Sequence, residues 1–150
     1  MTARPCSAER VVAIARSWIG TPYRHQASRR GAGTDCLGLI RGIWRELYGT
    51  EPEPIPAYTP DWSEPSGEEA VLDGARRHLR PVPLAAMRPG DVLVFRMRRR
   101  APAKHMGIRA GSTAAPTLIH AYSGRAVCES ALGPAWRARI AAAFRFPDPH

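Results

Sequence analysis

The 150-residue sequence has few cysteines and no long apolar run, and these absences narrow the class of protein. Its three cysteines, Cys6, Cys36 and Cys128, are too few for a disulfide scaffold, and the lack of a Cys-x-x-Cys pair disfavours a structural zinc site. No run of about 18 apolar residues exists, so we expect no transmembrane helix. Charged residues interrupt the first ten positions, where a secretory signal needs an apolar stretch, so we expect no signal peptide.

The composition predicts one folded domain spanning residues 1–150. Hydrophobic residues make up 44% of the chain, enough for a real core at this length. The net charge of +9 suits an anionic partner but does not identify one. The densest basic run, Arg96 to Arg100, is either a solvated loop or a docking surface. Because the basic residues are otherwise scattered and no nucleic-acid-binding motif accompanies them, we expect no specific nucleic-acid partner.

The first half of the chain predicts helices. Residues 7–19 and about 35–48 each place apolar residues on one helical face. Ser7 suits the N-cap of the first helix, and Thr34 and Gly49 suit the two ends of the second. A proline-rich loop over residues 51–66 precedes a third helix at roughly Gly67 to Leu79.

The second half predicts strands. Short apolar segments at residues 92–95, 106–108, 118–121 and 126–128 are separated by turn residues, and residues 142–146 predict a last strand. Helices followed by an antiparallel sheet define the α+β class.

Three residues could carry nucleophilic chemistry. Cys36 stands at the start of the second helix, where unpaired N–H groups and the helix dipole favour the thiolate. A thiolate needs a base and a group that orients the base, and His105 and His120 lie on two predicted strands. Each of these residues could instead be an inert core residue, since Cys36 also heads the apolar stripe of its helix.

The strand register tests whether the two histidines can act together. The strands that bear His105 and His120 predict a hairpin turning within Gly111 to Pro116. In an antiparallel pair, an odd sum of opposed residue numbers places both imidazoles on one face, and an even sum separates them. Gly107 would leave room beside the His105 ring. The sequence itself does not fix this register.

Five motifs in order, GTPYRHQ, TDCLGLIRGIW, RPGDVLVF, KHMGI and IHAY, resemble the NlpC/P60 family of papain-like cysteine peptidases, which cut peptidoglycan stem peptides. The resemblance runs from about residue 11 to residue 146. It implies a papain-like fold with N-terminal helices packed on a C-terminal antiparallel sheet, peptidoglycan as substrate, and neither metal nor cofactor.

The resemblance also implies roles for five residues. Cys36 matches the nucleophile, His105 the base and His120 the polar residue that orients the base. Tyr23 matches a tyrosine whose hydroxyl lies near the oxyanion site, and Asp35 matches an acidic residue that helps to bind polar groups of the substrate.

Leu37 departs from the small serine that usually follows the cysteine in this family, so substrate detail, including the scissile bond, does not transfer. Further motifs, RHQAS, DCLGLIRGIWRELYG, HAYSG and AFRFP, resemble the phage-tail and gene-transfer-agent members. That likeness implies synthesis in the cytoplasm without a leader, tail-tip or hub proteins as partners, and action at the wall of a target bacterium.

Two other interpretations of the same fold stay open at this point. One is a structural tail-tip protein that has lost cleavage, and the other is an amidase or acyl-transfer enzyme.

Overall fold

The computed structural model describes residues 7–54, 58, 69–122 and 124–148. Cys6 and most of the predicted loop at residues 51–66 lie outside these ranges. Four α-helices and one 3-10 helix are present in the described part: α1 (Ala8–Ser17), α2 (Cys36–Tyr48), α3 (Ala70–His78), η1 (Leu84–Ala86) and α4 (Pro134–Arg137). In these residues no helix is both long and apolar enough to cross a membrane.

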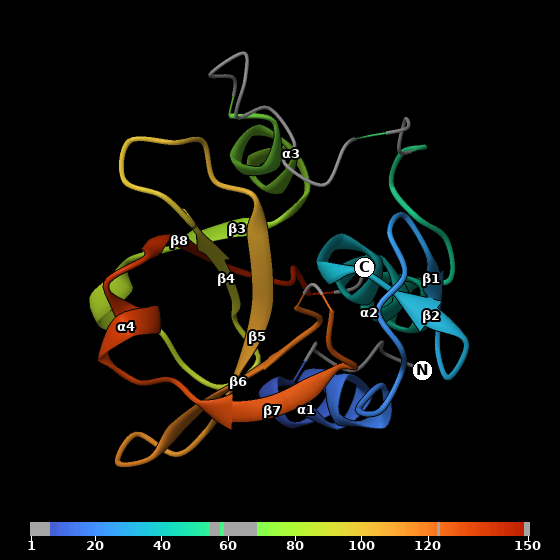
Figure 1. The fold of residues 1–150 in the computed structure, drawn as a ribbon, viewed down its shortest axis with the longest axis horizontal. Coiled ribbons are helices and arrows are strands. Elements are labelled where there is room, and N and C mark those ends of the chain that lie inside the picture. Colours follow the sequence, from blue (N-terminus) through green and yellow to red (C-terminus); the bar gives the residue numbers. More distant parts are fainter. Residues whose placement is uncertain (1–6, 55–57, 59–68, 123, 149–150) are drawn as a thin grey trace.

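The sheet has six antiparallel strands in the order β3-β8-β4-β5-β6-β7. Their bounds are β3 (Arg80–Val82), β4 (Val92–Phe95), β5 (His105–Gly111), β6 (Pro116–His120), β7 (Cys128–Ala131) and β8 (Ile140–Arg145). A separate hairpin of β1 (Ser28–Arg29) and β2 (Gly33–Thr34) precedes α2. Helices α1 and α2 both contact β5, beside the curved sheet (Figure 1). The predicted α+β class, with N-terminal helices and a C-terminal antiparallel sheet, is confirmed.

Both faces of the sheet are covered, and this explains the continuous apolar run in β4. Val92 and Val94 face the larger core, which α1 and α2 complete with side chains such as Leu39. Leu93 and Phe95 face a second, smaller core. A strand buried on both faces carries apolar residues throughout instead of alternating with polar ones.

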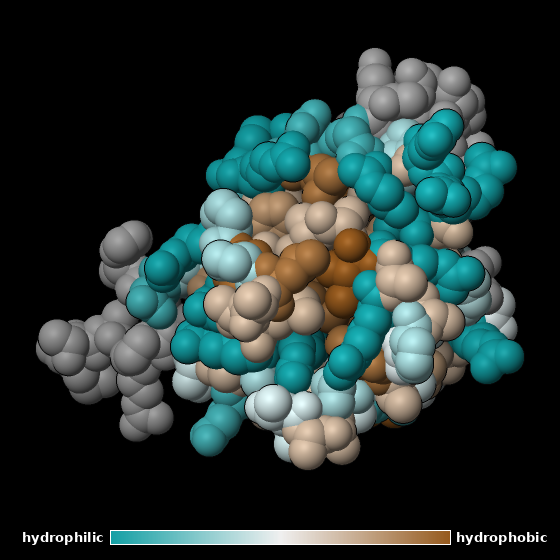
Figure 2. Space-filling model, turned by 90° about the vertical axis from the view of Figure 1, so that its left-hand side faces the viewer, coloured by the Kyte–Doolittle hydropathy of each residue, from teal (hydrophilic) through white to brown (hydrophobic). Residues whose placement is uncertain are grey.

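The second core is small and lies beneath a layer of partly buried side chains. Its buried members are Leu93, Phe95, Leu118, Leu132 and Ala143, and partly buried side chains pack over them: Val82, Met87, Met97, Trp136 and Ile140. On the side of the molecule that carries α4, Figure 2 shows hydrophobic residues at the centre of the face and hydrophilic residues around them.

The ends of α2 agree with the prediction at one terminus and not at the other. Gly49 ends the helix with a φ of 94°, a backbone conformation that favours glycine. The N-cap is Asp35, which accepts a hydrogen bond from the Gly38 amide, and not Thr34 as the sequence suggested. Thr34 is instead the last residue of β2, and its hydroxyl donates to the Asp35 carbonyl.

Several short elements were not predicted. They are the β1–β2 hairpin, β3, η1 and α4, each of four residues or fewer. Such elements are too short for a hydrophobic period to develop. Pro81 lies within β3, which the sheet tolerates because β3 is an edge strand.

Candidate active site

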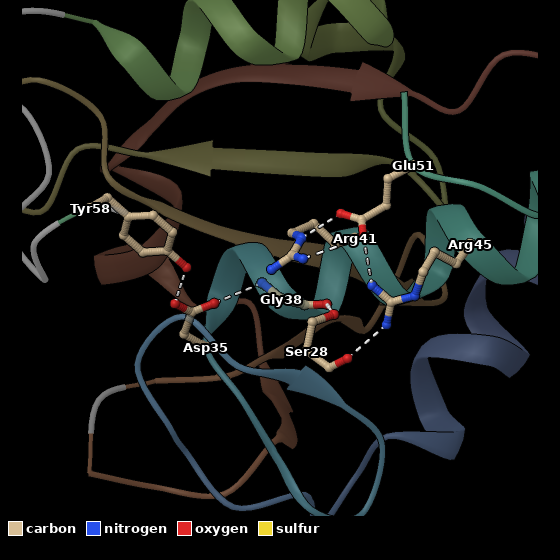
Figure 3. Close-up of polar contacts among 7 residues, drawn as sticks. All are labelled: Ser28, Asp35, Gly38, Arg41, Arg45, Glu51 and Tyr58. Carbon is tan, nitrogen blue, oxygen red and sulfur yellow. Dashed lines mark hydrogen bonds and ion pairs between the residues drawn. The ribbon is translucent and has the colours of Figure 1, made fainter. Parts of the chain in front are cut away.

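The start of α2 places Cys36 at the first helical position. The Asp35 carboxylate holds this helix start, because Oδ1 accepts from the Gly38 amide at 2.7 Å and Oδ2 accepts from the Gln26 amide at 2.7 Å. The Tyr58 hydroxyl donates to the same Oδ2, as Figure 3 shows. Asp35 is buried with its carboxylate engaged by donors of its own chain, and it therefore fixes the helix that carries the cysteine.

Gly38 allows this helix start to pack closely on the preceding loop. A Cβ at position 38 would lie 2.0 Å from the Ala27 carbonyl oxygen and 2.5 Å from the Thr34 hydroxyl oxygen. The Ser28 hydroxyl also donates to the Gly38 carbonyl at 2.6 Å, across the same contact (Figure 3). Only a residue without a side chain fits there.

The two histidines lie together in the structure. Ile108 of β5 pairs with Ile119 of β6, so opposed residue numbers have the odd sum that places both imidazoles on one face. His105 Nε2 lies 2.8 Å from His120 Nδ1, a hydrogen-bond distance. Both side chains are buried. A Cβ at Gly107 would lie 2.6 Å from Leu118 Cδ1 and 3.0 Å from His120 Cβ, so this glycine makes room for residues of β6, and not beside the His105 ring as the sequence suggested.

Burial keeps both imidazoles uncharged. It lowers the pKa of His105 to about 3, and the positive charges of His120 and Lys104 add to that effect. It lowers the pKa of His120 to about 4. The hydrogen bond between the rings is therefore a bond between neutral groups, in which one ring donates its N–H and the other accepts.

The Cys36 thiol meets the strand that carries His105. Its Sγ donates to the Lys104 carbonyl at 3.6 Å, and the Met106 amide also interacts with the sulfur. These two residues flank His105 in the chain. The hydrogen bond of the thiol is thus to the backbone beside the imidazole, while the imidazole nitrogen Nε2 faces His120.

Cys36 is protonated in this arrangement, contrary to the thiolate that its helix position suggested. Only 9% of the residue is exposed, and this burial, with the negative charge of Asp35, raises the pKa of the thiol to about 12. The amide groups at the helix start do lower the pKa, as expected, but burial outweighs them.

Tyr23 lies beside this helix start. It forms an isolated bridge with Thr34 and is partly buried against the larger core. Burial raises the pKa of its hydroxyl, and the negative charges of Asp35 and of the Cys36 sulfur, when it is ionised, raise it further. The phenol is therefore neutral and able to donate a hydrogen bond near the sulfur.

Tyr58 and Trp136 are site residues that the sequence analysis missed. Tyr58 comes from the proline-rich stretch, where no periodicity marks it, and its hydroxyl reaches Asp35. Burial and the hydrogen bond to Asp35 both raise its pKa. Trp136 comes from the short helix α4 and contacts both imidazoles. An isolated aromatic residue in the sequence was the only available signal for either one.

Leu37 lines a cavity of about 390 Å³ between α2 and α3. Met106 lines the same cavity, so one neighbour of Cys36 and one neighbour of His105 both face it. Apolar side chains form most of the remaining wall: Ile40, Trp44, Val71, Ala75 and Leu79. Ion pairs such as Arg41 with Glu51 stand at its border (Figure 3). Within the described residues, no group of three or more His, Cys, Asp or Glu side chains could hold a metal ion.

The fold is that of solved NlpC/P60 domains. The NlpC/P60 domain of the peptidoglycan hydrolase SagA aligns with a TM-score of 0.64 and 20% identity, over 93% of this chain and 99% of that one. An NlpC/P60 family protein from Bacillus cereus aligns with a TM-score of 0.66 and 21% identity, over 96% of this chain and 41% of that one. NlpC1 from Trichomonas vaginalis gives a TM-score of 0.62 and 18% identity, over 95% of this chain and 45% of that one.

The NlpC/P60 family profile matches residues 20–145, and the chain therefore belongs to the NlpC/P60 family. The matched span contains the cysteine, both histidines, Tyr23 and Asp35. No curated protein matches the chain significantly. This chain spans less than half of the length of the Bacillus and Trichomonas proteins.

Proposed function

We propose that the protein is a cysteine peptidase that hydrolyses peptide bonds in peptidoglycan stem peptides. Cys36 is its nucleophile, His105 its base and His120 the residue that orients the base. The observation that carries this proposal is the hydrogen-bonded histidine pair, whose first member sits between the two residues that contact the Cys36 sulfur.

Because Cys36 and His105 are both uncharged before the substrate binds, proton transfer between them accompanies the attack on the substrate. The Cys36 thiol gives its proton to His105 as the sulfur attacks the peptide carbonyl carbon, and the carbonyl oxygen becomes an oxyanion. The backbone N–H of Cys36 and the Tyr23 hydroxyl donate to that oxyanion, and one such donor contributes about 3–4 kcal/mol to lowering the barrier. His120 Nδ1 accepts the Nε2–H of the His105 imidazolium and so holds the charged ring in place.

The second half of the cycle returns every proton. His105 protonates the amine as the carbon–nitrogen bond breaks, leaving a thioester on Cys36. Water then attacks the thioester carbonyl, and His105 takes a proton from that water. The carbon–sulfur bond breaks, and the proton returns to the sulfur.

Purified cell-wall sacculi provide the test. The wild type and Cys128→Ala should release the same muropeptides, detected by mass spectrometry, whereas Cys36→Ala and His105→Gln should release none. Cys128 is the matched control because it is also a free cysteine of the described chain and lies in β7. Equal release by Cys36→Ala and the wild type would overturn the proposal. Cleavage between sugar and peptide, and not within the stem, would instead identify an amidase.

A second candidate is a catalytically inactive structural protein on the same fold. The observation that favours it is the burial of Cys36, together with the hydrogen bond of its thiol to a backbone carbonyl. Under this alternative, the wild type releases nothing from sacculi at any pH between 5 and 9, although it still sediments with them.

We further infer that the protein is assembled into the tail tip of a phage or gene-transfer agent and acts at the wall of a target bacterium. The sequence motifs RHQAS, HAYSG and AFRFP support this inference. Mass spectrometry of purified particles from the producing cells should detect the protein at a fixed ratio to hub proteins. Its absence from such particles would contradict this role.

A further inference from the structure

Trp136 is the residue of α4 that reaches the histidine pair. The centroid of its ring lies 5.4 Å from that of His105 and 5.1 Å from that of His120. The indole stands nearly perpendicular to His120, at 88°. Trp136 belongs to the partly buried layer over the second core, so the same side chain covers the core and contacts both imidazoles.

Two further aromatic rings complete the enclosure. Phe95 of β4 packs 5.7 Å from His105 and 5.2 Å from Trp136. Tyr122, which follows β6, lies 5.5 Å from His105 and 5.7 Å from Trp136. Phe95, Tyr122 and Trp136, here called the aromatic box, each contact His105, and Trp136 also contacts the other two rings.

We propose that Trp136 is a positioning residue, whose indole holds His105 and His120 in their hydrogen-bonded orientation and keeps water from both rings. The bond between Nε2 and Nδ1 needs one nitrogen with a hydrogen and one without. Protonation of His120 would turn its acceptor nitrogen into a second donor and break the bond. An indole that excludes water disfavours that protonation, because a buried imidazolium loses its hydration.

Positive charge near the aromatic box also disfavours protonation of His105. Lys104 precedes His105, and its positive charge opposes the imidazolium. The Arg139 guanidinium lies 6.0 Å from the Trp136 ring centroid. Arg96, which follows β4, is paired with Glu69 and so adds little net charge. The Tyr122 ring contacts both imidazoles, and the Cys36 thiol bonds to the backbone beside His105. The low pKa values of His105 and His120, about 3 and about 4, agree with this enclosure.

Histidine titration by NMR tests the proposal without reference to any substrate. In the wild type, the ring signals of His105 and His120 should show little protonation above pH 5. In Trp136→Ala both should titrate near pH 6, whereas Trp136→Phe, which keeps an aromatic ring, should resemble the wild type. Trp44→Ala is the matched control, since Trp44 packs against Tyr48 and Phe146 in the other core. It should leave both titrations unchanged.

Peptidase kinetics give a second measurement, which rests on the proposed function. If the pKa of His105 returns to its ordinary value of about 6.5, only about 3% of the base is neutral at pH 5, so kcat falls about thirtyfold. At pH 8, where both rings are neutral in either protein, the fall in kcat should be much smaller, and KM should change little at either pH. A wild type that cleaves nothing would end the peptidase proposal and leave the NMR test intact.

The proposal is overturned if Trp136→Ala titrates as the wild type does, or if Trp44→Ala raises both titrations equally, since the effect would then be a general loosening. Should Trp136→Ala fail to fold, Tyr122→Ala replaces it. Tyr122 is 38% exposed, so its truncation should be tolerated, and it should raise the His105 titration in the same direction.

Discussion

The two halves of the chain differ sharply in charge. Residues 1–78 contain ten basic and ten acidic residues, whereas residues 79–150 contain twelve basic and only three acidic ones, so the whole net charge of +9 belongs to the sheet half. In the helical half, ion pairs such as Arg41 with Glu51 and Arg77 with Glu53 balance the charges.

Each half keeps its own reactive group neutral. The helical half buries Cys36 beside the negative Asp35, which opposes the thiolate. The sheet half buries His105 beside the positive Lys104, which opposes the imidazolium. The site therefore holds an uncharged thiol and an uncharged imidazole. A charge that is introduced into or removed from either half should therefore shift the pKa of Cys36 or of His105, and the sign of the charge sets the direction of the shift.

The largest expected effect is the loss of stability in mild acid, and it arises in the sheet half. The folded-state pKa values of His105 and His120 lie below the ordinary value, so below pH 6.5 the unfolded chain binds protons that the folded chain does not. Stability is thus fully present above pH 6.5 and falls as the pH drops. Between pH 7 and pH 5 the loss is about 2 kcal/mol per histidine.

Urea denaturation at pH 7 and pH 5 measures this loss. The double variant His105→Gln/His120→Gln should show a nearly flat stability over the same range. His25→Gln serves as the control, because His25 is an exposed histidine of the helical half. An equally steep loss in the double variant would contradict the assignment to the histidine pair.

The next effect comes from the glycines that make room for the reactive groups. Gly38→Ala should cost about 3 kcal/mol or more, because the new Cβ meets backbone at Ala27 that cannot move away. In an open helix the same change stabilises by up to about 1 kcal/mol, so the sign is diagnostic. Thermal and urea unfolding measure the change.

Gly107→Ala is the comparison in the sheet half. Its new Cβ would lie 2.6 Å from Leu118 Cδ1, the end of a flexible side chain that can move, and 3.0 Å from His120 Cβ. The stability loss should be smaller than that of Gly38→Ala. A larger loss for Gly107→Ala than for Gly38→Ala would reverse the comparison.

Removal of the Asp35 charge should lower the pKa of the Cys36 thiol in part, because burial, the larger cause, remains. Asp35→Asn keeps an oxygen for the Gly38 amide but removes the negative charge, so the pKa of Cys36 should fall from about 12 toward its ordinary value. Because the new amide nitrogen faces other donors, stability should also fall by about 1 kcal/mol. Thiolate absorbance during a pH titration of a protein that lacks Cys6 and Cys128 measures the change. Asp73→Asn, at an exposed position on α3, should leave the titration unchanged.

The long helices, the β5–β6 hairpin and the motif residues could be predicted from the sequence, because hydrophobic period and turn residues are local signals. The protonation state of Cys36 could not. The helix start argues for a thiolate, and only the packing of α2 on β5 shows that burial outweighs it. Trp136 and Tyr58 could not be predicted as site residues for a similar reason, since their roles depend on contacts with residues far away in the chain. The sequence allowed either register of the histidine strands, with the imidazoles on one face or on opposite faces. The pairing of Ile108 with Ile119 in the structure places them on one face.

The smallest expected effect concerns one of the ion pairs between the two halves. Arg16 of α1 lies 2.9 Å from Glu129 of β7, and both partners are at least partly exposed. The Glu129 carboxylate also accepts from the Thr117 hydroxyl within the sheet, so it stays held when Arg16 is removed. Arg16→Ala should therefore lower the unfolding free energy by only about 0.5 kcal/mol, and less in high salt. A double-mutant cycle with Glu129→Gln, measured by urea denaturation in low and high salt, isolates this coupling. A coupling above about 2 kcal/mol that persists in high salt would mean that the pair locks the halves together, and the neutral Cys36 and His105 would then depend on that lock as well as on burial within each half.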